Sequence, residues 1–75
     1  MDTIEAQFAE RLRALRKEKE LTQAQAAAIF NVTSRHWQKL ERYNGENLTN
    51  VRRLVKIADF FGVSIDYLLG RRSDK

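Results

Sequence analysis

Apolar residues recur along this chain at helical spacing, in five short segments separated by polar ones. In the first segment, about 3–19, Phe8, Leu12 and Leu15 stand at i, i+4 and i+7 and form one stripe. In the fourth, which starts near residue 50, the apolar residues at helical spacing are Val51, Leu54, Val55, Ala58 and Phe61. The chain has no proline and three glycines, which favours compact helices over hairpins. The pattern predicts an all-α fold of five helices around one core.

Polar residues between these segments predict where the helices begin and end. Thr22 and Gln25 form a T-x-x-Q capping box, in which each side chain satisfies an unpaired backbone N–H group at the start of the second helix. Asn31 follows the end of that helix at Phe30, and asparagine tolerates the left-handed conformation that a tight turn needs. Caps at the later boundaries are predicted at Thr33, Ser64, Gly62 and Gly70.

The third helix, from 33 to about 42, separates apolar from polar side chains. At about 100° per residue, Leu40 lies about 60° from Trp37, and these two define an inward face. Arg35 and Lys39 lie about 160° from Trp37, on the opposite side. Arginine, lysine and glutamine match the hydrogen-bonding edges of guanine and adenine in the major groove of DNA. A solvated surface helix has the same pattern, so the helix alone leaves both interpretations open.

The distribution of charge favours a polyanionic partner. The chain has 14 Lys and Arg residues against 10 Asp and Glu residues. Basic and acidic residues balance in 1–31 and again in 59–75, whereas 32–58 holds six basic and two acidic residues. The net charge of +4 therefore comes from the third helix and the segment after it. A localised excess of this kind is typical of a nucleic-acid-binding surface.

Other classes of protein find little support in the composition. The chain has no cysteine, so neither a disulfide nor a thiolate metal site is expected. His36 is the single histidine, and without a second histidine we expect no metal, no cofactor and no catalytic site. No apolar run approaches the ~18–20 residues of a membrane span, and the acidic N-terminus is unlike a signal peptide. We therefore expect a cytoplasmic protein that is not an enzyme and does not contact membranes.

Three motifs together carry a family resemblance that extends from Phe8 to Gly70. They are L-T-Q at 21–23, the spacing from Ala27 through Val32 to Leu40-Glu41, and G-V-S-I-D-Y-L-L-G at 62–70. With these motifs the chain resembles the lambda-repressor-like helix-turn-helix family, the Cro- and Xre-type regulators of phages and bacteria. The resemblance implies one domain over 1–70, a homodimer, and an operator in double-stranded DNA that is an inverted repeat. Residues 71–75 are expected to form a flexible basic tail.

The resemblance also implies roles for individual residues. Gln23 matches a glutamine that binds a DNA phosphate, against the alternative of a plain exposed residue, and Arg16 and Glu41 match an internal salt bridge. Ser34, Arg35 and Lys39 match positions that contact bases, while Gln38 and Arg42 beside them fit either a base or a phosphate. We assign base contacts to Ser34, Arg35, Gln38 and Lys39, and phosphate contacts to Gln23, Thr33, His36, Arg42 and Asn44.

The chain departs from the family pattern at three places. Trp37 stands where the family usually has an inward Ile or Val, and Ala26 stands where it usually has Leu. We interpret the two as complementary, a larger ring against a smaller side chain. The alternative, that Trp37 stacks on DNA bases, conflicts with its angle to Arg35. The loop after Arg42 is about two residues longer than usual, which weakens the inference for Asn44.

The sequence therefore predicts a DNA-binding transcriptional regulator, and more specifically a repressor that acts by occupying its operator at the nucleoid of a bacterium. We expect occupancy because the chain has no room for a separate effector domain. An antitoxin or anti-repressor that binds another protein through the same fold is the alternative. A third interpretation is a helical bundle with a purely structural role, which the localised charge disfavours. For the dimer contact, Phe60, Phe61, Tyr67, Leu68 and Leu69 offer more apolar surface than the short last helix needs, unless all five complete the core.

Overall fold

The computed structural model of this chain describes residues 3–42 and 49–75. This part of the chain contains five helices: α1 (Ile4–Glu18), α2 (Gln23–Ile29), α3 (Ser34–Glu41), α4 (Val51–Phe61) and α5 (Ile65–Leu68). The described residues form no β-strand, which confirms the predicted all-α fold. None of their helices is both long and apolar enough to cross a membrane.

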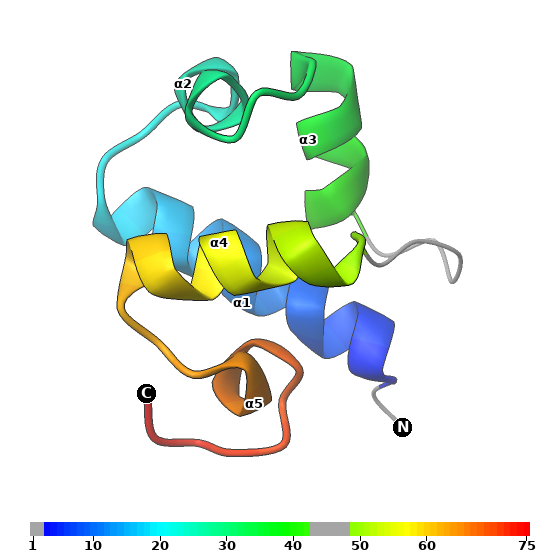
Figure 1. Ribbon diagram of the computed structural model, residues 1–75, viewed down its shortest axis with the longest axis vertical. Helices are drawn as coiled ribbons and strands as arrows, with labels where there is room; N and C mark the ends of the chain where they lie inside the picture. Colours follow the sequence, from blue (N-terminus) through cyan, green and yellow to red (C-terminus); the bar gives the residue numbers. More distant parts are fainter. Residues whose placement is uncertain (1–2, 43–48) are drawn as a thin grey trace.

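The helices are arranged so that α3 lies at one side of the molecule. Figure 1 shows α2 at the top, α3 descending on the right, α1 and α4 crossing the centre, and α5 below them. Helix α1 packs against both α3 and α5. Helix α2 packs against α3, and α4 packs against α5. The outer side of α3 is consequently free of other described helices (Figure 1).

The helix starts confirm the predictions made from polar residues. At every helix a hydroxyl or amide oxygen of the N-cap residue accepts a hydrogen bond from the backbone N–H three residues on, which satisfies a donor that the helix cannot. The capping box at α2 is complete: Gln25 N donates to Thr22 Oγ1 at 3.0 Å, and Thr22 N donates to Gln25 Oε1 at 2.8 Å. The caps of the other helices are Thr3, Thr33, Asn50 and Ser64.

Left-handed residues follow three of the described helices where the sequence predicted them, and one of these is Gly70 after α5, with φ 77°. Asn31 has φ 58°, and the N–H of Val32 reaches back to Ala27 O at 2.9 Å, which closes the turn between α2 and α3. Gly62 has φ 68° at the end of α4, a conformation that costs glycine little because it has no Cβ atom. Glu20, after α1, also has φ 56°, which the sequence analysis did not anticipate.

One apolar core joins all five helices. The predicted stripe of α1 is buried, with Phe8 and Leu12 at 0% exposure and Leu15 at 3%. Trp37 is also at 0% exposure, as predicted, and its ring stacks on that of Phe30 with centroids 5.3 Å apart. Ala26, Ala27, Leu40, Ile57, Ala58, Phe61, Val63 and Leu68 complete the buried cluster.

The prediction of which face of α4 is buried is partly wrong. Val51 and Val55 lie at helical spacing with the core residues but are 76% and 40% exposed. Ile57, which the spacing argument left out, is fully buried. Because α4 is apolar on more than one side, periodicity alone did not show which side meets the rest of the protein.

The apolar surface predicted for a dimer contact is largely used by the monomer. Phe61 and Leu68 belong to the core at 8% and 0% exposure, and Tyr67 and Leu69 are partly buried against it. Phe60 is the exposed member of the set, at 38%. Four of the five side chains therefore complete the fold, because α4 and α5 contact each other and these side chains belong to the core or pack against it.

The C-terminal residues, predicted as a flexible tail, contact the folded part of the chain. The N–H of Ser64 donates to Lys75 O at 3.1 Å, and Arg11 Nη1 donates to Arg72 O at 2.8 Å. Lys75 Nζ also lies 3.1 Å from a carboxylate oxygen of Glu18. Flexibility of 71–75 stays a prediction, and motion of the tail would have to break these contacts.

Truncation of Trp37 tests its place in the core. Trp37→Ala should lower the free energy of unfolding by about 3–5 kcal/mol, because it removes a fully buried ring and leaves a cavity. Val51→Ala, at an exposed site, should change it by no more than about 0.5 kcal/mol. Urea unfolding followed by circular dichroism measures both. A Trp37→Ala protein of unchanged stability that no longer binds DNA would instead support base stacking.

Candidate nucleic-acid interface

The core fixes the rotation of α3 about its own axis. Trp37 and Leu40 point into the protein at 0% and 2% exposure, and the indole ring lies nearly parallel to the ring of Phe30, at 7°. Phe30 itself packs edge-on against Phe60 of α4, with ring centroids 5.4 Å apart. With its inward edge held in this way, α3 turns its opposite edge to solvent.

A buried carboxylate ties α3 to α1 and α2. Glu41 is 7% exposed and accepts hydrogen bonds from three side chains. Arg16 of α1 binds it with both a 2.6 Å and a 3.1 Å contact, which confirms the predicted salt bridge. The indole N–H of Trp37 donates to the same carboxylate, and so does Gln23 Nε2 of α2, at 3.2 Å. The charge of Glu41 is thus compensated, as a buried ion requires.

The four predicted base-contacting residues lie together on the exposed side of α3. Ser34, Arg35, Gln38 and Lys39 are all exposed. Within residues 3–42 and 49–75, none of their side chains has a hydrogen-bond or ion-pair partner, so their donors are available to a ligand. No large apolar side chain of α3 is exposed, since those exposed among the described residues are Ile4, Ile29, Val51, Val55 and Phe60.

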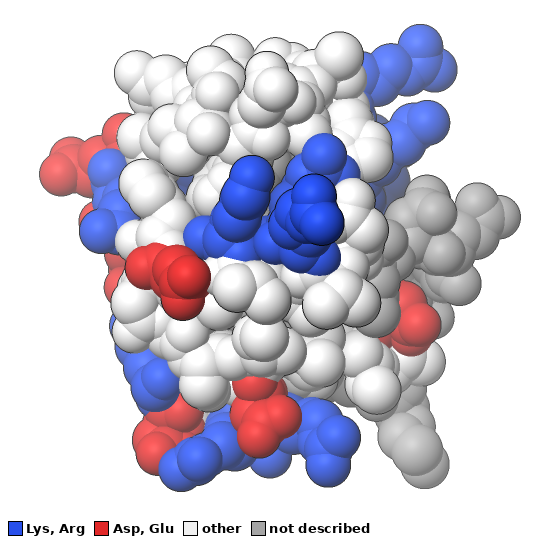
Figure 2. All heavy atoms as spheres, viewed as in Figure 1, with Lys and Arg blue, Asp and Glu red and all other residues white. Residues whose placement is uncertain are grey.

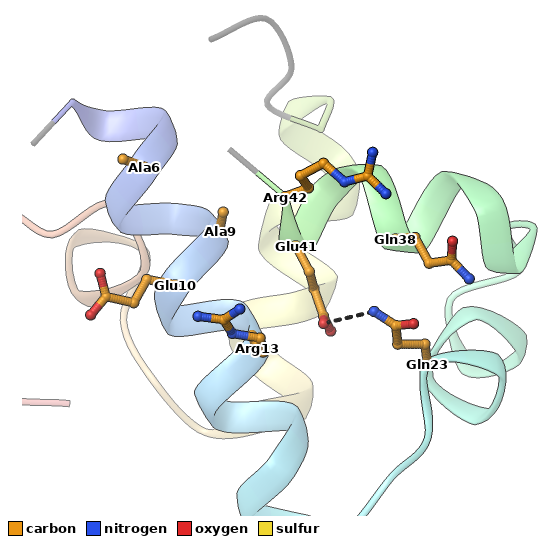
Figure 3. Close-up of a pocket in the computed structure, with 8 residues that line it drawn as sticks. All are labelled: Ala6, Ala9, Glu10, Arg13, Gln23, Gln38, Glu41 and Arg42. Carbon is orange, nitrogen blue, oxygen red and sulfur yellow. Dashed lines mark hydrogen bonds between the residues drawn. The ribbon is translucent and has the colours of Figure 1, made fainter. Parts of the chain in front are cut away.

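The predicted phosphate-contacting residues lie on both flanks of this surface. Arg42 lines a groove that α3 shares with α1, together with Gln38, a predicted base contact (Figure 3); the volume of the groove is about 490 Å³. Thr33 and His36 lie on the other flank, where Arg53 of α4 lines the same hollow. The backbone N–H of His36 donates to Thr33 Oγ1, so the Thr33 hydroxyl already caps the helix.

Gln23 is neither free nor plainly exposed. Its side chain is half-buried and donates one amide hydrogen to Glu41, as the dashed line in Figure 3 marks. The amide is thereby held at the edge of the groove, with its second hydrogen unused by any described residue. Asn44, the remaining predicted phosphate contact, lies outside the described residues.

Sequence reasoning located the charge of α4 but gave its residues no role. Arg52, Arg53 and Lys56 line a hollow of about 150 Å³ with Asn31 and Asn50, beside the turn between α2 and α3. Figure 2 shows basic side chains gathered on the face of α4 turned to the viewer and a second group at the upper right edge, on the side where α3 lies. The excess of positive charge in residues 32–58 was the available signal in the sequence. The fold brings the basic residues of α3 and those of α4 near one another.

Sequence reasoning also missed Arg13. It lies in residues 1–31, where basic and acidic residues balance, so charge counting gave no reason to select it. The structure places it in the lining of the groove with Gln38 and Arg42 (Figure 3).

Comparison with known proteins identifies the domain. Residues 12–68 match the helix-turn-helix family. The chain belongs to this family. Within it, a similar protein is the cryptic phage CTXphi transcriptional repressor RstR of Vibrio cholerae, 44% identical over 62 residues. The match covers 83% of this helix-turn-helix chain and 54% of RstR, so the chain spans about half the length of that relative. No solved structure matches the chain.

Removal of Arg16 tests the buried ion pair that positions the helix-turn-helix. Arg16→Met should lower the free energy of unfolding by about 3–5 kcal/mol, because it leaves the Glu41 charge buried without its main partner. Arg72→Met removes an arginine from the exposed pair with Asp74 and should cost about 1 kcal/mol or less. Chemical unfolding of the two variants compares them. Equal effects would mean that the Glu41 network does not stabilise the fold as described.

Proposed function

We propose that this protein is a sequence-specific transcriptional regulator that binds double-stranded DNA through α3, and that it represses the genes beside its operator. The observation that carries the proposal is the outer side of α3, where exposed Arg35, Gln38 and Lys39 have no partner among the described residues. Membership of the helix-turn-helix family and similarity to a phage transcriptional repressor support it. Repression would follow from occupancy, because a protein on the operator excludes other proteins from the same DNA.

Recognition of bases would rest on the middle of the exposed side of α3. In the major groove, Arg35 and Lys39 can donate to the O6 and N7 atoms of guanine, and Gln38 can pair with adenine. Ser34, in the first turn, would reach a base edge with its hydroxyl. These four contacts are proposals, and they agree with the family pattern at three of the positions.

Backbone contacts would come from the flanks and would set the register on DNA without reading sequence. On one flank, Gln23 and Arg42 would bind phosphates, and on the other Thr33 and His36 would do so. Arg53 lies beside His36 and adds a cation to that side. Because most of these groups are cationic or hydrogen-bond donors, the affinity should depend on salt concentration.

The alternative function is a protein-interaction module such as an antitoxin or anti-repressor. An interface with another protein usually centres on buried aromatic or aliphatic side chains. The exposed side of α3 carries no large apolar residue, and the exposed ones lie on other helices. The chemistry of α3 therefore favours DNA. A regulator of this kind would act in the bacterial cytoplasm, on phage or chromosomal DNA.

Selection of bound sequences from a random DNA pool tests the function and the residue roles together. The wild-type protein should enrich one motif, whereas Arg35→Ala and Lys39→Ala should each lose preference at one position per half-site. Each loss should cost about 1–3 kcal/mol on the selected site where the contact is bidentate. Gln23→Ala is the matched control, because it should weaken binding to all sequences alike. Flat enrichment by the wild type would favour the interaction module.

We also propose that two copies bind an inverted repeat. One recognition helix covers too few base pairs for selectivity in a genome, whereas a two-fold dimer presents two such helices about one DNA turn apart. The half-sites should therefore be centred ~10–11 bp apart. Footprinting on the selected operator should protect both half-sites, and titration should show two protomers per operator. Protection of a single half-site at saturation would contradict the dimer and leave DNA binding intact.

A further inference from the structure

The groove between α1 and α3 has a wall on α1 that no role derived so far uses. Ala6, Ala9, Glu10 and Arg13 stand at i, i+3, i+4 and i+7 and so share one face of α1. Gln38 and Arg42 of α3 and Gln23 of α2 complete the lining (Figure 3). The two alanines keep the groove open, because longer side chains at these positions would fill it.

Two arginines border the groove and are available to bind a ligand. Arg13 and Arg42 are both exposed, and neither side chain has a hydrogen-bond or ion-pair partner among the described residues. The two other arginines of α1 are engaged: Arg11 donates to backbone carbonyls at 2.9 and 2.8 Å, and Arg16 binds Glu41. Among residues 3–42 and 49–75, nothing uses the guanidinium donors of Arg13 and Arg42.

Neither acidic residue of the groove forms an ion pair with Arg13 or Arg42. Glu41 is buried, and its carboxylate is already bound by Arg16 with two hydrogen bonds. Glu10 is exposed and forms no ion pair with Arg13 in the structure, which leaves the arginine free. The amides of Gln23 and Gln38 add neutral N–H donors to the lining. The planar guanidinium group of an arginine presents several N–H donors in a fixed geometry, and with further N–H donors nearby it suits the oxygens of a phosphate group.

We propose that this groove seats the sugar-phosphate backbone of DNA beside the recognition helix, with Arg13 of α1 as a phosphate-binding residue opposite Arg42. The inference rests on the proposed function and extends it to a helix outside the helix-turn-helix. The groove is continuous with the base-reading surface, since Gln38 belongs to both. A peptide is a poorer occupant, because an interface with a peptide usually centres on large apolar side chains, whereas the apolar residues in this lining are two alanines.

The effect of Arg13 on salt dependence tests the proposal. The affinity of the wild-type protein for its selected operator is measured by fluorescence anisotropy from about 50 to 200 mM salt. Arg13→Ala should lower the affinity on the order of tenfold on every sequence and reduce the slope of log K against log salt by about 0.9, the value for one phosphate contact. Arg13→Lys, which keeps the charge, should retain the slope.

Arg71→Ala is the matched control. Arg71 is exposed, follows α5 at the far side of the molecule from α2, and does not line the groove. Both variants lose one positive charge, so the comparison holds the net charge of the protein fixed and differs in whether that charge lines the groove. Circular dichroism should show the wild-type melting temperature for Arg13→Ala, since alanine suits an exposed helix position. If Arg13→Ala and Arg71→Ala bind DNA alike, the groove does not hold the backbone.

Glu10, the exposed acidic residue of the groove, gives a prediction of opposite sign. Glu10→Gln removes a negative charge from the groove and should strengthen DNA binding more than Asp66→Asn, which removes one from α5. Ethylation interference should map one phosphate per half-site whose modification weakens the wild type but not Arg13→Ala. Absence of such a phosphate would overturn the proposal. A wild-type protein that binds no DNA at all would instead overturn the proposed function, so the two failures are distinguishable.

Discussion

The buried carboxylate of Glu41 is the interaction on which the arrangement of the helices depends. It sits at the end of α3 and accepts hydrogen bonds from Arg16 of α1, Gln23 of α2 and Trp37 one turn earlier in α3. A buried charge is costly unless it is paired and hydrogen-bonded, so these partners cannot separate without a large penalty. Three helices are thereby held to one another at a single point, in a domain whose core is small.

The same network connects the core to the surface that we propose for DNA. Trp37 is a core residue through its ring and a polar partner through its N–H group, a combination that an aliphatic side chain at this position does not offer. Gln23 uses one amide hydrogen inside the network and keeps the other for the groove. The rotation of α3 and the position of Gln23 therefore depend on the same carboxylate, which ties the geometry of base contacts to that of backbone contacts.

Positive charge on this protein is organised by the fold more than by the order of residues. Arg35 and Lys39 face outward on α3, while α4 brings Arg52, Arg53 and Lys56 to the turn before it. On the other flank, α1 brings Arg13 to the groove beside Arg42. The surface is then a central strip that can read bases with a basic border on each side, which is the distribution expected of a protein that holds both DNA backbones next to the major groove.

The sequence by itself determined the features that depend on local contacts. Helix starts at Thr22, Thr33 and Ser64 and the left-handed turn at Asn31 follow from hydrogen bonds within a few residues, and the structure agrees with each. The inward face of α3 was also predictable, because one large ring and one leucine define a single apolar edge. The family pattern supplied the pairing of Arg16 with Glu41, which no local rule contains.

Tertiary structure decided which of several apolar faces is buried and which distant charges meet. On α4 the spacing of Val51 and Val55 matched a core stripe, yet Ile57 faces the core, because neighbouring helices select the side that packs. For the same reason, the apolar side chains predicted for the dimer contact pack into the core of the monomer, except Phe60, which stays exposed. Arg13 could not be selected from a balanced stretch of charge, since its role depends on α3 lying across a groove from it. Periodicity reports the chemistry of each helix face, whereas packing between helices determines what that face meets.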